Sequence, residues 1–229
     1  LEFGTGGLRG IIGAGTNRIN KYTVRKASQG LANYIKKKGI KAMGRGVVIA
    51  FDSRHMSKEF SEEAALVLAA NGIKVYVFED LRPTPELSFA VRYLKAIAGI
   101  VITASHNPAN YNGYKVYWED GAQIATKLAK DITEEIRGIH DFYKSVSMDK
   151  EEALRGGLLQ YIGKDIDDPY YKEVIGQSLR KEVIDQVRED FKIIFTPLHG
   201  TGNLPVRTVL REVGFKNVLV VPQQELPDP

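Results

Sequence analysis

The sequence contains no cysteine, which excludes a disulfide framework and any metal site built from thiolates. No apolar stretch approaches membrane-spanning length, so no membrane contact is expected. The chain also lacks a basic run interleaved with aromatic residues, the pattern typical of nucleic-acid binding, although its net charge is +4. These absences predict a soluble protein, placed in the cytoplasm, whose mild positive charge suits an anionic substrate.

The beginning of the chain carries no targeting signal. Leu1 stands where an initiator methionine would be, and no charged-then-apolar leader precedes Phe3. We therefore expect no secretory signal peptide, and we expect that earlier residues have been removed. A chain of 229 residues with ordinary apolar and charged fractions has room for one large or two modest domains.

Ser105 is expected on a loop at the end of a buried strand. The preceding run, residues 98–102, is short, apolar and rich in β-branched side chains, as in strands that are covered on both faces. Asn107-Pro108 ends it, because proline cannot donate to a strand ladder and restricts the residue before it. In α/β folds ligands collect at this carboxyl edge of the sheet.

Strands and helices alternate through the first 150 residues. Apolar residues at helical spacing alternate with short β-branched runs, which predicts an α/β layer whose helices cover a largely parallel sheet. After Ser105, the alternation at 114–118 predicts a hairpin strand, with Glu119-Asp120-Gly121 as its turn. The helices are predicted at 21–38, 57–71, 85–94 and 124–136, and the strands at 47–51, 73–78, 98–102 and 114–118. Ser57 is expected to cap the second of these helices.

A second, shorter copy of the same unit is predicted toward the end of the chain. Residues 145–168 mix charge, glycine and Asp167-Asp168-Pro169, which is typical of a linker that ends in a turn and a helix cap. A helix over 170–187 and a strand over 191–195 follow. Residues 67–75 and 209–217 share one pattern, each ending a helix and opening a strand. The expected fold is therefore α/β, with repeated mixed-sheet domains over 1–150 and 160–229.

Two further loops carry polar residues of interest. Four glycines between Gly4 and Gly10 surround Arg9, so the backbone N–H groups and the guanidinium could grip an anion, although a simple terminal segment has the same composition. Asp52-Ser53-Arg54 follows the strand at 47–51, where an ion pair within the loop and a substrate contact are about equally expected. His55 is expected to be exposed only.

Three motifs carry a family resemblance. Thr103-Ala104-Ser105-His106-Asn107-Pro108, the segment Phe3–Gly10 and the segment Asn112–Tyr117 together resemble the α-D-phosphohexomutase superfamily of phosphoglucomutases and phosphomannomutases. The resemblance implies a complete domain I with helices on both sheet faces, followed by a truncated domain II. It also implies an intramolecular phosphotransferase that interconverts sugar 1-phosphate and 6-phosphate through a phosphoserine and a bisphosphate intermediate.

The same resemblance implies a role for each matching residue. Ser105 would carry the phosphoryl group, and Lys115 would act as general acid or base with its pKa depressed by neighbouring positive charge. Arg9 would supply positive charge and His106 would contact substrate. The substrate-binding residues would be Thr5, Gly6, Asn107, Asn112 and Arg54. Mg²⁺ would bind through the phosphate on Ser105, and a sugar 1,6-bisphosphate would be the activator.

The sequence departs from the family pattern at its end. The D-G-D-x-D-R loop that supplies the aspartate ligands of Mg²⁺ in this family is absent, so the chain alone is expected to be nearly inactive and to bind Mg²⁺ weakly. The segment from about residue 170 is expected to be less stable than residues 1–150, because the truncated second copy leaves a strand edge unpaired. Such an edge also favours self-association with a second molecule.

Two other functions stay open at this stage. A noncatalytic phosphate-binding module would share the glycine-rich segment. A serine hydrolase would use Ser105 and His106, but no G-x-S-x-G elbow is present, and adjacent side chains are expected to diverge. The sugar is not decided among glucose, mannose, glucosamine and pentose phosphates, although the sequences of the motifs favour glucose.

Overall fold

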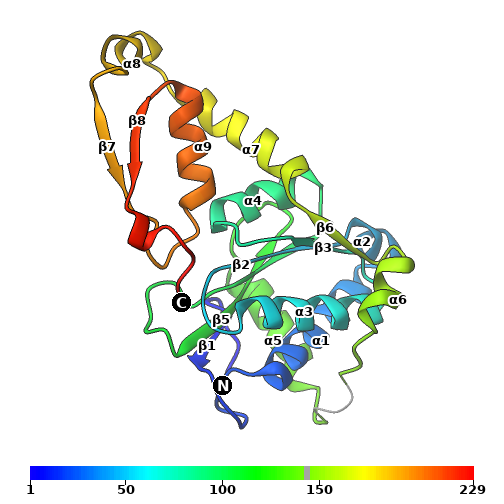
Figure 1. Ribbon diagram of the computed structural model, residues 1–229. Helices are drawn as coiled ribbons and strands as arrows, with labels where there is room; N and C mark the ends of the chain where they lie inside the picture. The colour runs from blue at the N-terminus through cyan, green and yellow to red at the C-terminus, as the bar shows by residue number, and fades with distance from the viewer. Residues whose placement is uncertain (142–144) are drawn as a thin grey trace. The chain divides into compact units, whose positions relative to one another are not determined.

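The computed structural model describes residues 1–141 and 145–229. The chain divides into two compact units, Leu1–Ile162 and Gly163–Pro229. The first unit contains, in chain order, β1 (Leu8–Ile11), α1 (Lys21–Lys37), α2 (Ile40–Arg45), β2 (Val47–Phe51), α3 (Ser57–Ala70), β3 (Val75–Phe78), α4 (Thr84–Tyr93), β4 (Ala98–Ile102), β5 (Tyr111–Trp118), α5 (Thr126–Arg137), α6 (Lys150–Arg155) and β6 (Leu159–Ile162) (Figure 1).

The first unit is built on one mixed sheet of six strands. Their order is β1-β5-β4-β2-β3-β6. β2 pairs in parallel with both β3 and β4, and β6 adds in parallel to β3. β5 runs antiparallel to both of its neighbours, β1 and β4. The predicted mixed-sheet α/β class is therefore confirmed.

The central strands are buried on both faces. Every residue of β2 and of β4 is buried, which explains why both segments are uniformly apolar instead of alternating. Helices α1, α3 and α5 lie on one face and α4 lies on the other (Figure 1). The larger core lies on the α1, α3 and α5 side, where Ile49, Ile100 and Ile102 point from the strands. Helices on both faces are likewise as predicted.

Helix α1 begins at a capping box and buries one stripe. The Asn20 side chain accepts from the backbone N–H of Thr23, and the Thr23 hydroxyl accepts from the backbone N–H of Asn20. Leu31 and Ile35, four residues apart, are completely buried against the core. A cap at one end and an apolar stripe along one face therefore explain why these residues form a helix.

The structure corrects three predictions about the secondary structure of the first unit. Residues 8–11 form strand β1 where a glycine-rich loop was predicted, because the backbone pairs with β5. The predicted linker contains α6 and the edge strand β6. Ser57 is the first residue of α3 and not its cap; Met56 precedes it with left-handed backbone, φ 64°. In each case tertiary pairing or burial overrides the local composition.

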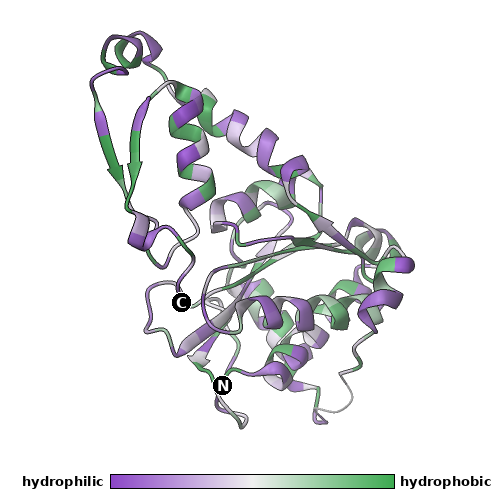
Figure 2. Cartoon of the chain, viewed as in Figure 1, coloured by the Kyte–Doolittle hydropathy of each residue, from purple (hydrophilic) through white to green (hydrophobic). Residues whose placement is uncertain are grey.

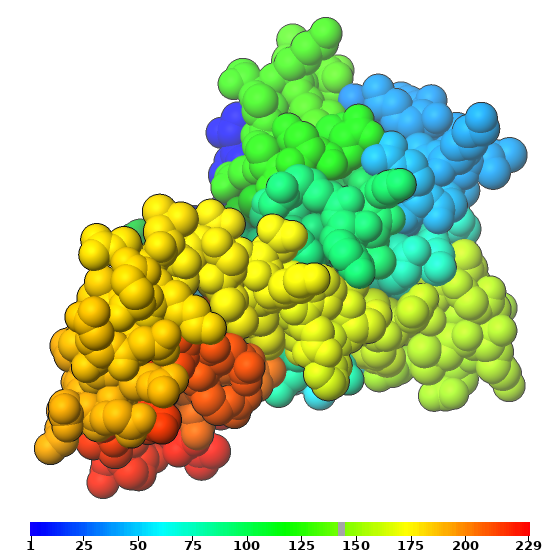
Figure 3. Space-filling view, turned by 90° about the horizontal axis from the view of Figure 1, so that it is seen from above, coloured from blue at the N-terminus to red at the C-terminus, as the bar shows by residue number. Residues whose placement is uncertain are grey.

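The second unit contains α7 (Lys164–Gly176), α8 (Lys181–Val187), β7 (Lys192–Phe195), α9 (Asn203–Val213), β8 (Asn217–Val220) and a short 3₁₀ helix, η2 (Pro222–Gln224). The single helix predicted over 170–187 is wrong: α7 ends at Gly176 and α8 begins at Lys181. α7 also continues through Pro169, and Ile166 and Tyr171 on either side of it are buried. Within this unit α7 packs beside α9 (Figure 3).

The small sheet of the second unit leaves apolar residues in solvent. β7 and β8 pair in parallel, and both carry hydrophobic residues (Figure 2). Ile194 lies opposite Leu219, and their side chains are 75% and 57% exposed. A two-stranded sheet has little stability of its own. The lower stability and the self-association expected of this segment stay predictions.

Gly30 and Gly44 offer a matched test of the packing between α1 and α5. A Cβ on Gly30 would lie 2.2 Å from Ile136 Cγ1, whereas a Cβ on Gly44 in α2 would meet nothing within 4 Å. We predict that Gly30→Ala destabilises the fold by about 1–3 kcal/mol through overpacking. Gly44→Ala should stabilise it by about 0.5–1 kcal/mol through helix propensity. Urea unfolding of both variants measures the change in the free energy of unfolding. Equal changes of the same sign would contradict the close packing of α1 against α5.

Candidate functional site

The polar loops of the first unit meet at the carboxyl edge of β2 and β4. Ser105 follows β4, and Asp52 follows β2, where its backbone N–H donates to Ile102 O at 3.2 Å. The antiparallel strands bring in two more segments: in the register, Tyr114 of β5 lies opposite both Ile102 of β4 and Leu8 of β1. The four segments that contain Ser105, Arg54, Arg9 and Lys115 therefore share one end of the sheet.

Ser105 stands on unusual backbone. Its φ is +59°, in the left-handed region that costs a residue with a Cβ on the order of 1–3 kcal/mol. Two local bonds hold the turn: the Ser105 N–H donates to Thr103 Oγ1 at 2.9 Å, and the Asn107 N–H donates to Ala104 O at 3.2 Å. The Ser105 side chain is exposed. The loop thus presents a hydroxyl to solvent at the end of a rigid strand.

His106 lies closer to Ser105 than its adjacency in sequence predicted. Ser105 Oγ and His106 Nδ1 are 3.3 Å apart, so the expectation that the two side chains diverge is wrong. The left-handed backbone at Ser105 redirects its side chain relative to an extended one. Among the described residues, no carboxylate bonds to His106, so the third group that orients a catalytic histidine is not seen there.

Arg9 reaches the Ser105 loop from the edge strand. Its Nη1 donates to Asn107 Oδ1 at 3.0 Å. The strand can lie this close because Gly7 has φ +75°, and a Cβ there would lie 1.9 Å from Tyr114 O. Thr5 and Gly6 are exposed on the turn before β1, and Gln123 Nε2 donates to Thr5 O at 2.7 Å. Gly7 therefore permits the close strand approach, and Arg9 supplies the charge.

Lys115 is the second cation of the site. Arg9 lies opposite Gly113 on β5, which makes Lys115 its diagonal neighbour on the same face. Partial burial and the Arg9 charge lower the pKa of Lys115, and the Asp52 carboxylate opposes this shift. Neither a hydrogen bond nor an ion pair holds its Nζ within the part of the chain that the structure describes. Lys115 is thus available to exchange a proton.

Arg54 and Asn112, both predicted to bind substrate, have internal partners. Arg54 Nη2 donates to Ser105 O at 2.8 Å, and its Nε lies 3.5 Å from Asp52 Oδ2. Asn112 is fully buried, and its Nδ2 donates to His55 O and to Ser57 Oγ, both at 2.9 Å. A substrate contact by either side chain would have to replace these bonds. The contact itself stays a prediction.

Two residues of the site, Thr103 and Ser57, were not predicted to belong to it, whereas the ion pair between Asp52 and Arg54 was one of the two expected roles of their loop and is confirmed at 3.5 Å. Thr103 supports the Ser105 N–H, Ser57 donates to Asp52 Oδ1 at 2.6 Å, and Asp52 accepts from the Arg54 backbone N–H at 3.1 Å. The Asp52-Ser53-Arg54 segment at a strand end was the available signal, and it indicated an ion pair or a ligand without distinguishing them. His55 is exposed, as predicted.

The residues beside Ser105 do not form a magnesium cage. Across residues 1–141 and 145–229, no three His, Cys, Asp or Glu residues are placed to hold a metal ion. Asp52, the carboxylate that acts on Lys115, already accepts from Ser57 and Arg54. The described residues around Ser105 therefore do not by themselves make a metal site.

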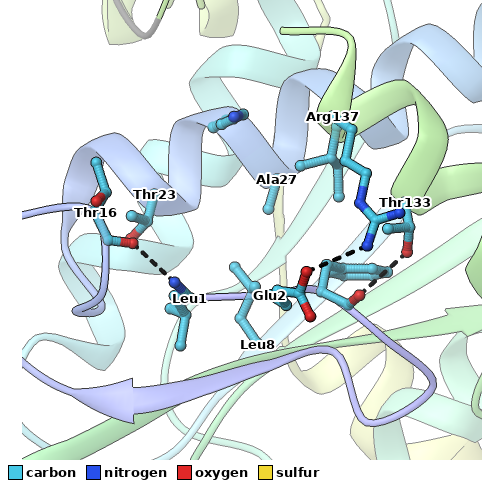
Figure 4. Close-up of a pocket in the computed structure, with 11 residues that line it drawn as sticks. Leu1, Glu2, Leu8, Thr16, Thr23, Ala27, Thr133 and Arg137 are labelled. Carbon is cyan, nitrogen blue, oxygen red and sulfur yellow. Dashed lines mark hydrogen bonds and ion pairs between the residues drawn. The ribbon is translucent and has the colours of Figure 1, made fainter. Parts of the chain in front are cut away.

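A cavity of about 270 Å³ lies elsewhere in the first unit (Figure 4). The N-terminal segment, α1 and α5 line it, and none of its lining residues comes from the Ser105 loop. The Leu1 backbone nitrogen donates to Thr16 O at 3.0 Å on one side, and Arg137 pairs with Glu2 at 3.2 Å on the other. The cavity is therefore separate from the sheet edge at which the candidate site lies.

No helix within the described residues is long and apolar enough to span a membrane. The architecture and the site together define an α/β protein that presents a serine at the carboxyl edge of a mixed sheet, with an arginine on β1 and a lysine on β5 at the same end of that sheet.

Comparison with known proteins assigns the family. Residues 1–142 match the family model described as phosphoglucomutase/phosphomannomutase, alpha/beta/alpha domain I. The chain therefore belongs to the phosphoglucomutase/phosphomannomutase family. It is 40% identical over 229 residues to a phosphoglucomutase of Staphylococcus saprophyticus and 38% identical to that of Staphylococcus haemolyticus. All of the chain aligns, and it spans 40% of the length of each relative.

Solved structures agree on the fold. A candidate phosphomannomutase from Thermus thermophilus superposes with a TM-score of 0.75 at 27% identity, covering 99% of this chain and 46% of that one. Parafusin from Paramecium superposes with a TM-score of 0.70 at 18% identity, covering 99% and 43%. The second similarity bears on the fold alone.

The Lys115 pKa provides a direct test of the site's electrostatics. Arg9→Gln removes a positive charge that disfavours protonated Lys115, so we predict that the Lys115 pKa rises and that its neutral fraction falls at any given pH. Arg137→Gln, on α5, is the control and should leave that pKa unchanged. The pH dependence of acetic anhydride labelling, quantified on the Lys115 peptide, measures both. An unchanged or lowered pKa in Arg9→Gln would refute the coupling.

Proposed function

We propose that the native protein containing this chain transfers phosphoryl groups within sugar phosphates, interconverting the 1-phosphate and the 6-phosphate of glucose. The observation that carries this proposal is the exposed Ser105 hydroxyl on left-handed backbone, with Arg9 bonded to the same loop through Asn107 and Lys115 diagonal to Arg9 on β5. The family assignment and two relatives named phosphoglucomutase support it, and their names favour glucose over the other sugars.

Ser105 acts as the phosphoryl carrier. In the first half-reaction the bond between Ser105 Oγ and phosphorus breaks while a sugar hydroxyl oxygen bonds to the same phosphorus. This yields a sugar bisphosphate and the free serine. In the second half-reaction the other phosphoryl group of the bisphosphate moves to Ser105 Oγ, which regenerates the phosphoserine. The departing serine oxygen takes up a proton from water in the first half-reaction, and the serine gives a proton up to water as it attacks in the second.

Lys115 transfers the proton of the sugar hydroxyl, and Arg9 stabilises the charge on the transferring phosphoryl group. The attacking hydroxyl must lose a proton, and a Lys115 with a lowered pKa has a neutral fraction that accepts it; the protonated form returns it in the second half. Arg9 stays charged and offers N–H donors to the oxygens of the transferring phosphoryl group. Mg²⁺ and a sugar 1,6-bisphosphate remain expectations from the family resemblance.

A serine hydrolase is the second candidate, favoured by the 3.3 Å contact between Ser105 Oγ and His106 Nδ1. In that reading His106 removes the serine proton and the acyl group occupies Ser105. His106→Ala separates the two functions, because a hydrolase loses its base, whereas a phosphoserine carrier keeps its oxygen. A noncatalytic phosphate-binding module would show neither turnover nor a covalent intermediate.

The experiment is substitution of Ser105 in the native protein that contains this chain. We predict that Ser105→Ala abolishes conversion of glucose 1-phosphate to glucose 6-phosphate together with covalent phosphorylation, because the carrier oxygen is gone. Lys115→Ala should remain phosphorylatable but lose about 10²–10⁴-fold in kcat. Ser178→Ala, an exposed serine between α7 and α8, is the control. Retention of turnover and phosphorylation in Ser105→Ala would remove Ser105 from the mechanism.

A further inference from the structure

The guanidinium of Arg54 is directed at backbone carbonyls of the Ser105 loop. Nη2 donates to the carbonyl oxygens of Ser105 and Asn107, and Nη1 donates to those of Pro108, at 2.9 Å, and Tyr111, at 3.2 Å. Four N–H groups of one side chain therefore bond to four carbonyls within a seven-residue segment.

The fifth N–H group of Arg54 is paired with a carboxylate, and the side chain is nearly buried. Arg54 Nε faces Asp52 Oδ2, and the two side chains are 9% and 12% exposed. Because all the N–H groups have partners inside the protein, Arg54 has no donor left for a bound phosphate in this arrangement. A nearly buried arginine paired in this way fixes geometry and does not recruit anions from solvent.

The bonds continue behind Arg54 into β5. Asp52 Oδ1 accepts from Ser57 Oγ, Ser57 Oγ accepts from Asn112 Nδ2, and Asn112 Oδ1 accepts from the Gly113 N–H at 2.7 Å. The loop after β2, the loop after β4 and the start of β5 are thus tied into one hydrogen-bonded unit. Left-handed backbone at Met56 and at Ser105 occurs at its two ends.

We propose that Arg54 is a positioning residue, whose guanidinium holds the backbone of the Ser105 loop in the conformation that presents the serine oxygen, and that it does not contact the sugar phosphate. This inference rests on the proposed function for its catalytic consequence. It replaces the substrate contact that the sequence suggested for Arg54. Arg9 and Lys115, which have donors to spare, are left to contact the phosphoryl group.

The structural part of the proposal is tested on the 229-residue chain itself. In Arg54→Gln, amide hydrogen exchange at Ser105, Asn107 and Tyr111 should accelerate by about tenfold or more, while β3 amides stay protected. Arg45→Gln is the matched control. Arg45 also donates to two backbone carbonyls, those of Lys95 at 2.7 Å and Ala96 at 3.2 Å, and pairs with Glu119, but at the beginning of β4. It should leave the Ser105 loop unchanged.

Arg54→Lys decides between positioning and charge. Lysine keeps the positive charge but cannot make the four carbonyl bonds, so it should accelerate exchange nearly as much as glutamine does. If Arg54→Gln does not fold, hydrogen exchange of the Ser105 loop in Arg54→Lys alone tests the proposal. Wild-type exchange of the loop in Arg54→Lys, or in Arg54→Gln, would overturn the proposal.

The catalytic part is tested on the native protein that contains the chain. Arg54→Lys should lower kcat about tenfold or more with KM for glucose 1-phosphate within about twofold, because only the placement of the reacting oxygen is disturbed. If Arg54→Gln raises KM and Arg54→Lys has the wild-type KM, Arg54 would instead be a substrate ligand. That result would overturn the proposal. Absence of turnover in the unmodified protein would refute the proposed function, and the exchange result would still decide the positioning role.

Discussion

The antiparallel insertion of β5 between β1 and β4 is the constraint on which the candidate site depends. A purely parallel sheet would separate Arg9 and Lys115 from the strand that carries Ser105. β5 instead pairs with both neighbours, and Tyr114 lies between Leu8 and Ile102. The pairing demands close backbones: a Cβ on Gly113 would lie 2.5 Å from Thr103 O and 2.9 Å from Leu8 O. A residue with no side chain at this position is therefore part of how the serine obtains its neighbours.

The charges at this edge have separate tasks. The nearly buried Arg54 side chain pairs with Asp52 and donates to the Ser105 loop. Arg9 and Lys115, in contrast, keep N–H groups that can donate to a molecule from solvent. Asp52 connects the two groups, because it neutralises Arg54 and also opposes the lowering of the Lys115 pKa. Removing either member of a nearly buried ion pair leaves the other uncompensated. The site therefore combines an internally neutral support with an outward positive surface, which suits a phosphoryl group.

Local sequence patterns predicted the central strands and the long helices well. The runs at 47–51 and 98–102 have the stated bounds of β2 and β4, since strands covered on both faces are apolar throughout. The pattern could not predict β1 or β6, whose few residues become strands only through pairing with β5 and β3. The sequence allowed the ion pair of Arg54 with Asp52 as one of two alternatives, but it could not predict the carbonyls that Arg54 bonds or the partners of Asn112, because sequence does not show which way a guanidinium or an amide points. The Ser105–His106 contact depends on a left-handed backbone that composition does not specify.

The chain belongs to the phosphoglucomutase/phosphomannomutase family and spans about two fifths of the length of its relatives. The central claim is that Ser105 carries the phosphoryl group. The most direct measurement is intact mass and peptide mapping of the native protein that contains this chain after incubation with glucose 1,6-bisphosphate. We expect one added phosphoryl group, located on the Ser105 peptide and removed by subsequent glucose 1-phosphate. An unmodified Ser105 peptide, or a phosphoryl group found only at another residue, would contradict it.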